Sequence, residues 1–300
     1  MPSIREHIEH LPQAALLRAV GRAAEQLGVP AYAVGGVVRD ALLGRETTDV
    51  DFVTVGPGSG LAVAEATAAA LGGRAVHVYP SFGTAAIRIP GRNGDPETVL
   101  EFVAARRESY RSSSRKPEVE EGTLMDDLAR RDFTINAMAV DVHETRFGEL
   151  VDPFGGMDDL GDHVLRTPLP PARTFEDDPL RMIRAARFAT QLQFRIDREA
   201  LDAMQAQAQR VSILSQERIT DELQKILCAE RPSIGFAILQ QVGILPLIFP
   251  ELSRLEGVEA IDGHRHKDNF HHTLQVVDNL VEMTWNRSCD ETLWLRWAAL

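Results

Sequence analysis

The chain has 300 residues, enough for roughly two domains. Its 44% hydrophobic and 25% charged residues are typical of a globular enzyme and exclude a disordered chain, a collagen and a disulfide-stapled miniprotein. With 32 Lys and Arg against 44 Asp and Glu, the net charge is −12. Taken alone, this charge disfavours a nucleic-acid-binding protein, because phosphate contacts favour a basic surface.

The sequence predicts a cytoplasmic protein. Its first residues carry Glu6 and Glu9 and no apolar core of a signal peptide. No apolar run approaches the roughly 20 residues that a bilayer span needs. Cys228 and Cys289 lie far apart without metal-like spacing, so we expect two reduced thiols.

The first 150 residues alternate between helix and strand patterns. Residues 14–28 have the period of an amphipathic helix, and Gly35 and Gly36 open a second helix that runs to Leu43. Residues 49–54 alternate strictly, as a half-buried strand does. A further helix is predicted at 59–71, with strands at 31–34, 74–78, 84–89 and 98–103. This order predicts an α+β head with a mixed sheet.

The strand signal disappears after residues 152–156, and from Asp178 onward the pattern predicts helices only. Residues 294–300 are an apolar helical pattern without a cap, which favours a truncated last domain. We expect a head, an all-α neck and an all-α body, which would cover residues 1–150, 151–228 and 229–300. The helices of this half are predicted at 178–192, 198–209, 215–228 and 232–241.

Two carboxylates on the predicted strand 49–54 suggest a metal site. Asp49 and Asp51 are two residues apart, so both project to the same face of the strand. Such carboxylates repel each other unless a divalent cation neutralises them, and Mg²⁺ prefers a few carboxylates plus substrate phosphates. The alternative is a solvated pair on an exposed face. Glu101, on the predicted strand 99–103, is the best candidate for a third carboxylate.

A glycine turn precedes this strand in the segment VGGVVRD, residues 34–40. Backbone N–H groups and a helix N-terminus face one point there, and Arg39 adds a fork of phosphate donors. The segment lacks the third glycine of a dinucleotide-binding motif and the Gly-Lys-Ser/Thr of a Walker loop. A phosphate cradle beside paired carboxylates suits two-metal phosphoryl or nucleotidyl transfer.

The segment GGVVRDALLGRETTDVDFVT, residues 35–54, closely resembles the head signature of the tRNA nucleotidyltransferase and poly(A) polymerase family. The resemblance is to its class II, bacterial-type members, which add CCA to tRNA 3′ ends. The resemblance continues in the family's order through four further segments. They are RRDFTINAM (130–138), DPFGG (152–156), EDDPLRMIR (176–184) with Arg187-Phe188, and ERI (217–219) with EL (222–223).

The resemblance implies template-independent addition of C, C and A to the tRNA 3′ end from CTP and ATP. Asp49 and Asp51 would hold two Mg²⁺ ions, and Glu101 would support the first metal or accept a proton. Arg131 and Asp132 precede a predicted apolar helix, where the alternative to a nucleotide contact is a capping Asp with a solvated Arg. The nucleotide-binding residues expected in the head are Gly35, Gly36, Arg39, Arg131, Asp132 and Asn136.

The predicted helix 178–192 carries Asp178, Arg181, Arg184 and Arg187 at intervals of three, on one broad face. A carboxylate only accepts and a guanidinium only donates, so an Asp–Arg pair prefers the base edge of cytosine or adenine over that of uracil or guanine. The resemblance gives this role to Asp178 and Arg181. An Arg-rich solvated helix side is the alternative for all four residues.

Two further segments bear on the substrate. Residues 106–124 are polar, and the family has a flexible loop here that helps switch from C to A addition, which favours full CCA addition over CC-only addition. The alternative for this segment is an ordinary surface excursion. Residues 166–198 hold seven Arg and four acids, a local charge of +3 that leaves −15 for the rest. The sequence therefore predicts that tRNA meets a confined basic track.

Four histidines, His264, His266, His271 and His272, crowd a short stretch and suggest a metal site. The run from His271 resembles the start of an HD-type domain, but the His-Asp pair and later Asp of such a site do not follow, so we expect no complete site. The functional alternatives are a poly(A) polymerase, a CC-only or A-only adder, or an inactive RNA-binding remnant. An HD-type phosphohydrolase is disfavoured, because the sequence lacks the residues of its metal site.

Overall fold

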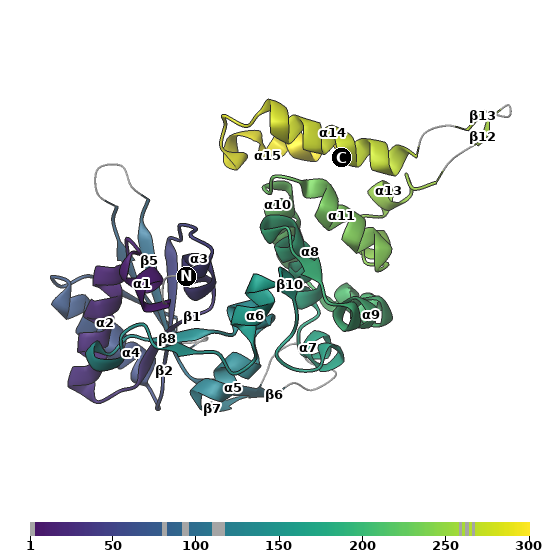
Figure 1. Cartoon of the computed structure of the whole chain (residues 1–300). Helices are drawn as coiled ribbons and strands as arrows, with labels where there is room; N and C mark the ends of the chain where they lie inside the picture. The colour runs from purple at the N-terminus through teal and green to yellow at the C-terminus, as the bar shows by residue number, and fades with distance from the viewer. Residues whose placement is uncertain are drawn as a thin grey trace. The chain divides into compact units, whose positions relative to one another are not determined.

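The computed structural model describes residues 4–79, 83–91, 96–109, 118–257, 260–261, 264–265 and 268–300. It divides into two compact units, Met1–Asp162 and His163–Leu300, coloured purple to teal and teal-green to yellow in Figure 1. In the described part of the chain, none of the helices combines the length and apolar character that a membrane span requires.

A seven-stranded mixed sheet forms the centre of the first unit, in the order β3-β4-β5-β2-β1-β8-β9. Only β2 and β5 pair in parallel, and the other neighbours are antiparallel. The predicted mixed sheet is therefore confirmed. Its strands are β1 Ala31–Val34, β2 Asp49–Thr54, β3 Val76–Tyr79, β4 Thr84–Ile89, β5 Thr98–Ala104, β8 Ala139–Asp141 and β9 Leu150–Val151.

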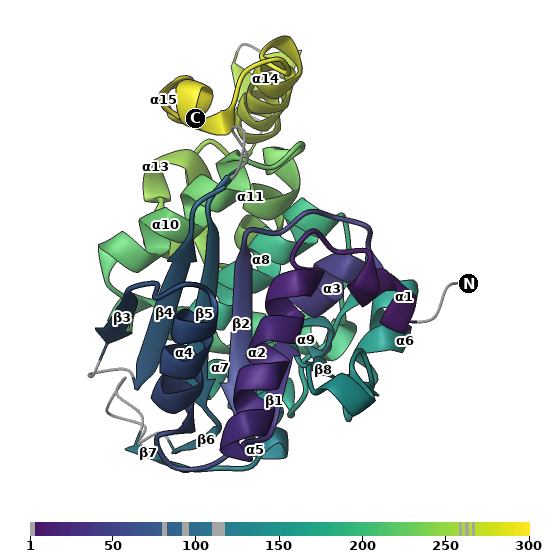
Figure 2. The same cartoon turned by 90° about the vertical axis from the view of Figure 1, so that its left-hand side faces the viewer.

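Two helices, α2 (Ala14–Leu27) and α4 (Ser59–Ala70), pack on each other and cover one face of this sheet (Figure 2). Gly21 of α2 has no room for a side chain, because a Cβ would lie 1.8 Å from the carbonyl oxygen of Val142. The remaining helices of the unit are short: α1 Ile4–Glu9, α3 Gly36–Leu42, α5 Leu124–Ala129 and α6 Gly156–Gly161.

The alternation of strand side chains gives the sheet two different faces. Phe52 and Phe102 stack on one face with ring centroids 5.0 Å apart. On the other face, Val53 joins a buried cluster with Val34 and with Leu128 of α5. Because Asp51 and Asp49 are two and four residues before Val53, they share its face of β2.

The segment after Asp132 differs from the prediction. Thr134–Asn136 is a single 3₁₀ turn and Ala139–Asp141 is the strand β8, which pairs with β1. The predicted apolar helix is therefore wrong. A short apolar run does not distinguish a buried strand from a buried helix, and residues 137–140 are all 0% exposed.

The polar segment 106–124 begins and ends as an antiparallel pair, β6 (Arg106–Ser109) with β7 (Glu118–Glu121). The middle of the expected flexible loop, residues 110–117, lies outside the described residues.

Helices dominate the second unit, in which α8 packs against α10 and α11. The expectation of helices only fails at short strands: β11 (Arg195–Ile196) pairs in parallel with β10 (Val164–Leu165), and β12 (Ala260–Ile261) pairs with β13 (His264–Arg265). The helices are α7 Pro171–Asp177, α8 Leu180–Leu192, α9 Arg198–Gln207, α10 Gln216–Leu227, α11 Pro232–Gln241, α12 Leu245–Ile248, α13 Pro250–Ser253, α14 Asn269–Met283 and α15 Cys289–Ala298.

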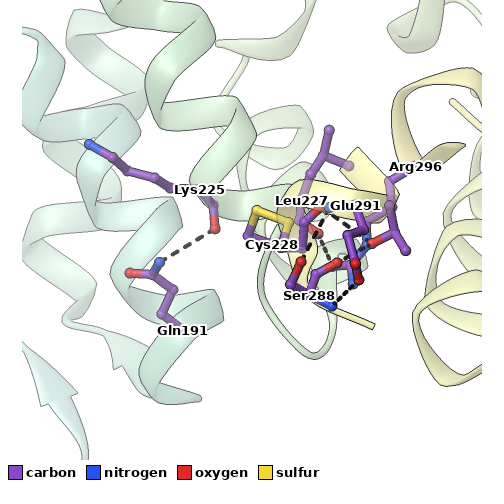
Figure 3. Close-up of a disulfide and its surroundings, with 9 residues drawn as sticks. Gln191, Lys225, Leu227, Cys228, Ser288, Glu291 and Arg296 are labelled. Atoms are coloured by element: carbon purple, nitrogen blue, oxygen red, sulfur yellow. Dashed lines mark hydrogen bonds between the residues drawn. A yellow bond between two sulfur atoms is a disulfide. The ribbon is translucent and has the colours of Figure 1, made fainter. Parts of the chain in front are cut away.

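A disulfide joins Cys228, which follows α10, to Cys289 at the start of α15 (Figure 3). The expectation of two reduced thiols is therefore wrong. The two helices pack together, and buried Arg296 of α15 donates a hydrogen bond from Nη1 to the carbonyl oxygen of Leu227, 2.6 Å away. This packing brings the two cysteine Cα atoms to 5.3 Å, although 61 residues separate them in sequence.

Candidate active site

The three predicted carboxylates lie at the centre of the mixed sheet. In the parallel pairing of β2 with β5, Asp51 is in register with Glu101, and Asp49 with Val99. Registered residues of neighbouring strands project to the same face. Asp51 is half-buried, whereas Asp49 and Glu101 are exposed. The sheet therefore brings the three acids to one face.

The charges of these acids oppose one another. Burial raises the pKa of the Asp51 carboxyl, Arg131 counteracts this shift, and the negative charges of Asp49 and Asp127 add to it. The pKa of Glu101 is also raised, by partial burial first and then by the charges of Asp51 and Asp49. A cation bound here would favour the ionised forms, so the donor set suits a divalent metal.

The described side chains do not complete a metal site by themselves. Among the residues with described positions, no group of three or more His, Cys, Asp or Glu side chains lies close enough to hold a metal ion. Mg²⁺ commonly takes part of its oxygen ligands from a substrate phosphate and from water.

A pocket of about 150 Å³ opens beside the carboxylates. Two acids and three arginines face it, which suits an anionic ligand that also carries a cation. The residues that line it are Asp51, Phe52, Thr84, Glu101, Phe102, Val103, Arg106, Arg130 and Arg131.

Two of these arginines share one buried carboxylate that the sequence motifs did not reveal. Asp127 Oδ1 accepts hydrogen bonds from Nε of Arg130, at 3.1 Å, and from its Nη2. Asp127 Oδ2 accepts from Nε and Nη2 of Arg131, at 3.3 and 3.2 Å. The available signal was the spacing, because residues three and four apart on a helix are neighbours.

The glycine turn contacts the same arginine. Gly35 has a φ of 74°, and a Cβ there would lie 2.6 Å from Nη1 of Arg131. Its N–H donates to the carbonyl oxygen of Met138, 3.1 Å away. Gly36 has more room, since its nearest neighbour would be Nη2 of Arg39 at 3.7 Å. Of the two glycines, Gly35 is the one that both conformation and space require.

A polar network links the other residues expected to bind the nucleotide in the head. Arg39 donates from Nε and Nη2 to the two carboxylate oxygens of Asp40, both at 2.8 Å, and from Nη1 to Asn136 Oδ1 at 2.7 Å. Asn136 Nδ2 in turn donates to Asp132 Oδ1, 3.0 Å away. Arg39, Asn136 and Asp132 are therefore held together, and their contact with a nucleotide stays a prediction.

In the second unit, α8 begins two residues later than predicted. Asp178 has an extended conformation with φ of −142°, because the residue before a proline avoids the helical region. Its Oδ1 accepts from the backbone N–H of Leu180 and its Oδ2 from Nη2 of Arg218, both at 3.0 Å. Arg181 is buried and donates from Nη1 to the carbonyl oxygen of Thr174 at 3.3 Å.

The two remaining arginines of α8 have different environments. Arg184 is half-buried, with its Cζ 5.4 Å from the ring centre of Phe188. Arg187 is buried and forms an ion pair with Glu222 of α10, with 3.2 Å between Nε and Oε2. Arg187 therefore joins two helices, and its expected nucleotide contact stays a prediction.

The histidines near the end of the chain form no described metal cluster. His271 pairs with Asp268, with 2.9 Å between Nδ1 and Oδ2, and both His271 and His272 are exposed at the start of α14. His266 and the side chain of His264 lie outside the described residues. The start of an HD-type domain stays a prediction.

Comparison with known proteins places this geometry in a family. Residues 31–166 match the poly A polymerase head domain, and residues 193–255 match the probable RNA and SrmB-binding site of polymerase A. A solved tRNA nucleotidyltransferase, complexed with a primer tRNA and an incoming ATP analog, is 32% identical with a TM-score of 0.73. That match covers 94% of this chain and 74% of the other.

The chain belongs to the class II CCA-adding enzyme and poly(A) polymerase family. The resemblance drawn from the sequence motifs is therefore confirmed, as is the α+β head followed by helices.

Two curated proteins of the family are similar over most of the chain. An A-adding tRNA nucleotidyltransferase from Aquifex aeolicus is 42% identical over 204 residues, which are 67% of this chain and 23% of that protein. A multifunctional CCA protein from Ralstonia nicotianae is 38% identical over 290 residues, which are 91% of this chain and 60% of that protein. The chain thus spans less than two thirds of the length of these relatives.

Proposed function

We propose that this protein adds CCA to the 3′ end of tRNA from CTP and ATP, without a nucleic-acid template. The observation that carries the proposal is the register of Asp51 with Glu101 beside a pocket that Arg130 and Arg131 line. The names of the curated relatives support tRNA as the substrate. Such an activity agrees with the cytoplasmic location expected from the sequence.

The carboxylates of Asp49 and Asp51 would hold two Mg²⁺ ions. Ions held there would lower the pKa of the terminal 3′-hydroxyl and would balance the charge of the triphosphate and of the leaving pyrophosphate. Glu101, whose pKa is raised, would either accept the hydroxyl proton or support the first metal. The 3′-oxygen then bonds to the α-phosphorus, and the bond to the pyrophosphate oxygen breaks.

The remaining residues bind and select the nucleotide. Arg131 holds phosphate oxygens, and we assign the same role to the glycine turn and to Arg39. Asp178 and Arg181 select cytosine and adenine through complementary accepting and donating groups. The hydrogen bonds of Asp178 to Leu180 and Arg218 support this assignment, because they restrict its carboxylate.

An A-only activity is the second candidate. The relatives from Aquifex aeolicus and Halalkalibacterium halodurans, which are 42% and 37% identical, are both named A-adding tRNA nucleotidyltransferases. An A-only enzyme extends a tRNA that already ends in CC and leaves one that lacks all three nucleotides unchanged.

The test is incorporation of labelled CTP and ATP into tRNA with Mg²⁺ by the full chain and by Asp51→Asn. We expect incorporation to fall by about 100- to 1,000-fold or more. The control is Glu97→Gln, which removes an exposed carboxylate that pairs only with Arg88 in the described contacts. Full activity of Asp51→Asn would refute the metal assignment.

A further inference from the structure

A buried carboxylate lies behind the wall of the pocket. Asp127 of α5 is 0% exposed, and each of its oxygens serves one arginine, Oδ1 for Arg130 and Oδ2 for Arg131. The two arginine side chains keep 20% and 17% exposure, and both line the pocket with Asp51 and Glu101. One hidden negative charge therefore anchors two positive groups that face the carboxylates of the sheet.

Helix stability alone does not account for this arrangement. An exposed ion pair at such spacing contributes only about 0.3–0.5 kcal/mol. A buried carboxylate instead loses several kcal/mol of hydration, and an apolar residue at its place is often neutral or stabilising. What the buried Asp127 adds is a defined position for the guanidinium groups of Arg130 and Arg131.

Arg131 is restrained from three sides and still has donors to offer. Its Nε and Nη2 bond to Asp127, and its Nη1 donates to the carbonyl oxygen of Asn136, 3.5 Å away. Gly35 closes the third side, because even a Cβ on this residue would lie only 2.6 Å from Nη1. These contacts use three of the five N–H donors of a guanidinium, and a planar fork of donors matches phosphate oxygens.

We propose that Asp127 is a positioning residue that holds Arg130 and Arg131 at the pocket wall, where both bind the triphosphate of the incoming nucleotide. The inference rests on the proposed function and adds Arg130 as a triphosphate ligand and Asp127 as the group that orients both arginines. Donors fixed in advance bind a charged ligand without reorganisation. Asp127 therefore acts on nucleotide affinity through the arginines.

The experiment measures binding of MgATP to the full chain by calorimetry, without tRNA. Asp127→Asn removes the charge that anchors the arginines, and we expect the Kd for MgATP to rise by about tenfold or more. The matched control is Asp126→Asn, one residue away on the same helix, because Asp126 pairs with Arg107 and does not line the pocket. The control should change the Kd by less than about twofold.

A second comparison separates positioning from a general loss of folding. In the double variant Arg130→Gln/Arg131→Gln, adding Asp127→Asn should leave the KM for ATP unchanged, because the groups that Asp127 positions are gone. This triple variant also contains no unpaired buried charge. Asp127→Glu keeps the charge but shifts it by one methylene, so it should fold and still weaken MgATP binding.

The outcomes are distinct. A wild-type chain that neither binds MgATP nor extends tRNA overturns the proposed function and this inference together. A wild-type chain that is active, with Asp127→Asn and Asp127→Glu binding MgATP as tightly as Asp126→Asn, overturns only this inference. This inference alone is also overturned if Asp127→Asn raises the KM for ATP equally in the presence and in the absence of the two arginines.

Discussion

At the residue scale, the ionised carboxylate of Asp51 lowers the stability of the fold. Burial raises its pKa, so the folded chain binds this proton more tightly than the unfolded chain does. The associated stability is present at low pH and is lost as pH rises through the folded pKa. At neutral pH the ionised carboxylate therefore destabilises the protein until a cation neutralises it.

We predict that Asp51→Asn raises the free energy of unfolding at neutral pH, without metal, by about 1 kcal/mol. The gain should shrink as pH falls towards the ordinary aspartate range. Thermal unfolding across pH measures this, with Asp49→Asn as the control, because Asp49 is exposed on the same strand. Mg²⁺ should raise the Tm of the wild type more than that of Asp51→Asn. If Asp51→Asn and Asp49→Asn lowered the free energy of unfolding equally, the ionised Asp51 carboxylate would not destabilise the fold.

Gly35 provides a second prediction at this scale. Gly35→Ala should lower stability by about 1–3 kcal/mol, since its φ of 74° strains other residues. It should also raise the KM for ATP, because the new Cβ displaces Arg131. The control is Gly44→Ala, where φ is 65° but a Cβ meets nothing within 4 Å. If both variants changed the KM alike, the turn would not position Arg131.

The sequence allowed some of these residues to be found and not others. Asp49 and Asp51 were predictable because a spacing of two on a strand fixes a common face, and the strand occurs where the alternation indicated. Asp127 was not, because an acid three and four residues before arginines is typical of any solvated helix surface. Its proposed positioning role depends on burial, which arises from the packing of α5 near Val53 and Val34.

At the scale of elements, the disulfide clamps α15 to the end of α10. We predict that Cys289→Ser lowers the free energy of unfolding of the second unit by about 2–4 kcal/mol, because the bond closes a long loop in the unfolded chain. Chemical denaturation of the variant and of the wild type with and without reductant measures this. The reduced wild type should have the same free energy of unfolding as the variant. If reductant left the stability of the wild type unchanged, the disulfide would be contradicted.

The start of α8 provides the prediction on base selection. Asp178→Ala removes the only accepting group of the proposed base-reading pair, so discrimination against UTP should weaken by about 10-fold or more relative to CTP. Competition of UTP with CTP in the extension assay measures the ratio. A control is Asp177→Ala on the preceding helix. Unchanged selectivity in Asp178→Ala would refute the base-reading assignment.

Elements whose signal is local were predictable, and those set by distant packing were not. The helices at 14–27 and 232–241 follow the predicted bounds within one residue. The sequence of β8 does not distinguish a strand from a helix, because full burial removes the alternation that marks a strand. The disulfide was missed because two cysteines far apart in sequence meet only when α15 folds back on α10.

At the scale of the whole molecule, the net charge of −12 has to be reconciled with the proposed RNA substrate. The basic segment 166–198 is less exposed than its composition indicated. Arg181 and Arg187 are buried, and Arg166 and Arg173 pair with acids. Fewer arginines of this segment are therefore available to phosphates than the local charge of +3 implied, so we expect tRNA affinity to depend modestly on salt.

The most direct measurement is sequencing of the products that the full chain makes from two tRNA primers, one lacking CCA and one ending in CC, with CTP, ATP and Mg²⁺. We predict that both primers end in CCA and that Asp51→Asn extends neither. Extension of the CC primer alone would identify an A-only enzyme and contradict the full activity. No extension of either primer by the wild-type chain would contradict the proposed function itself.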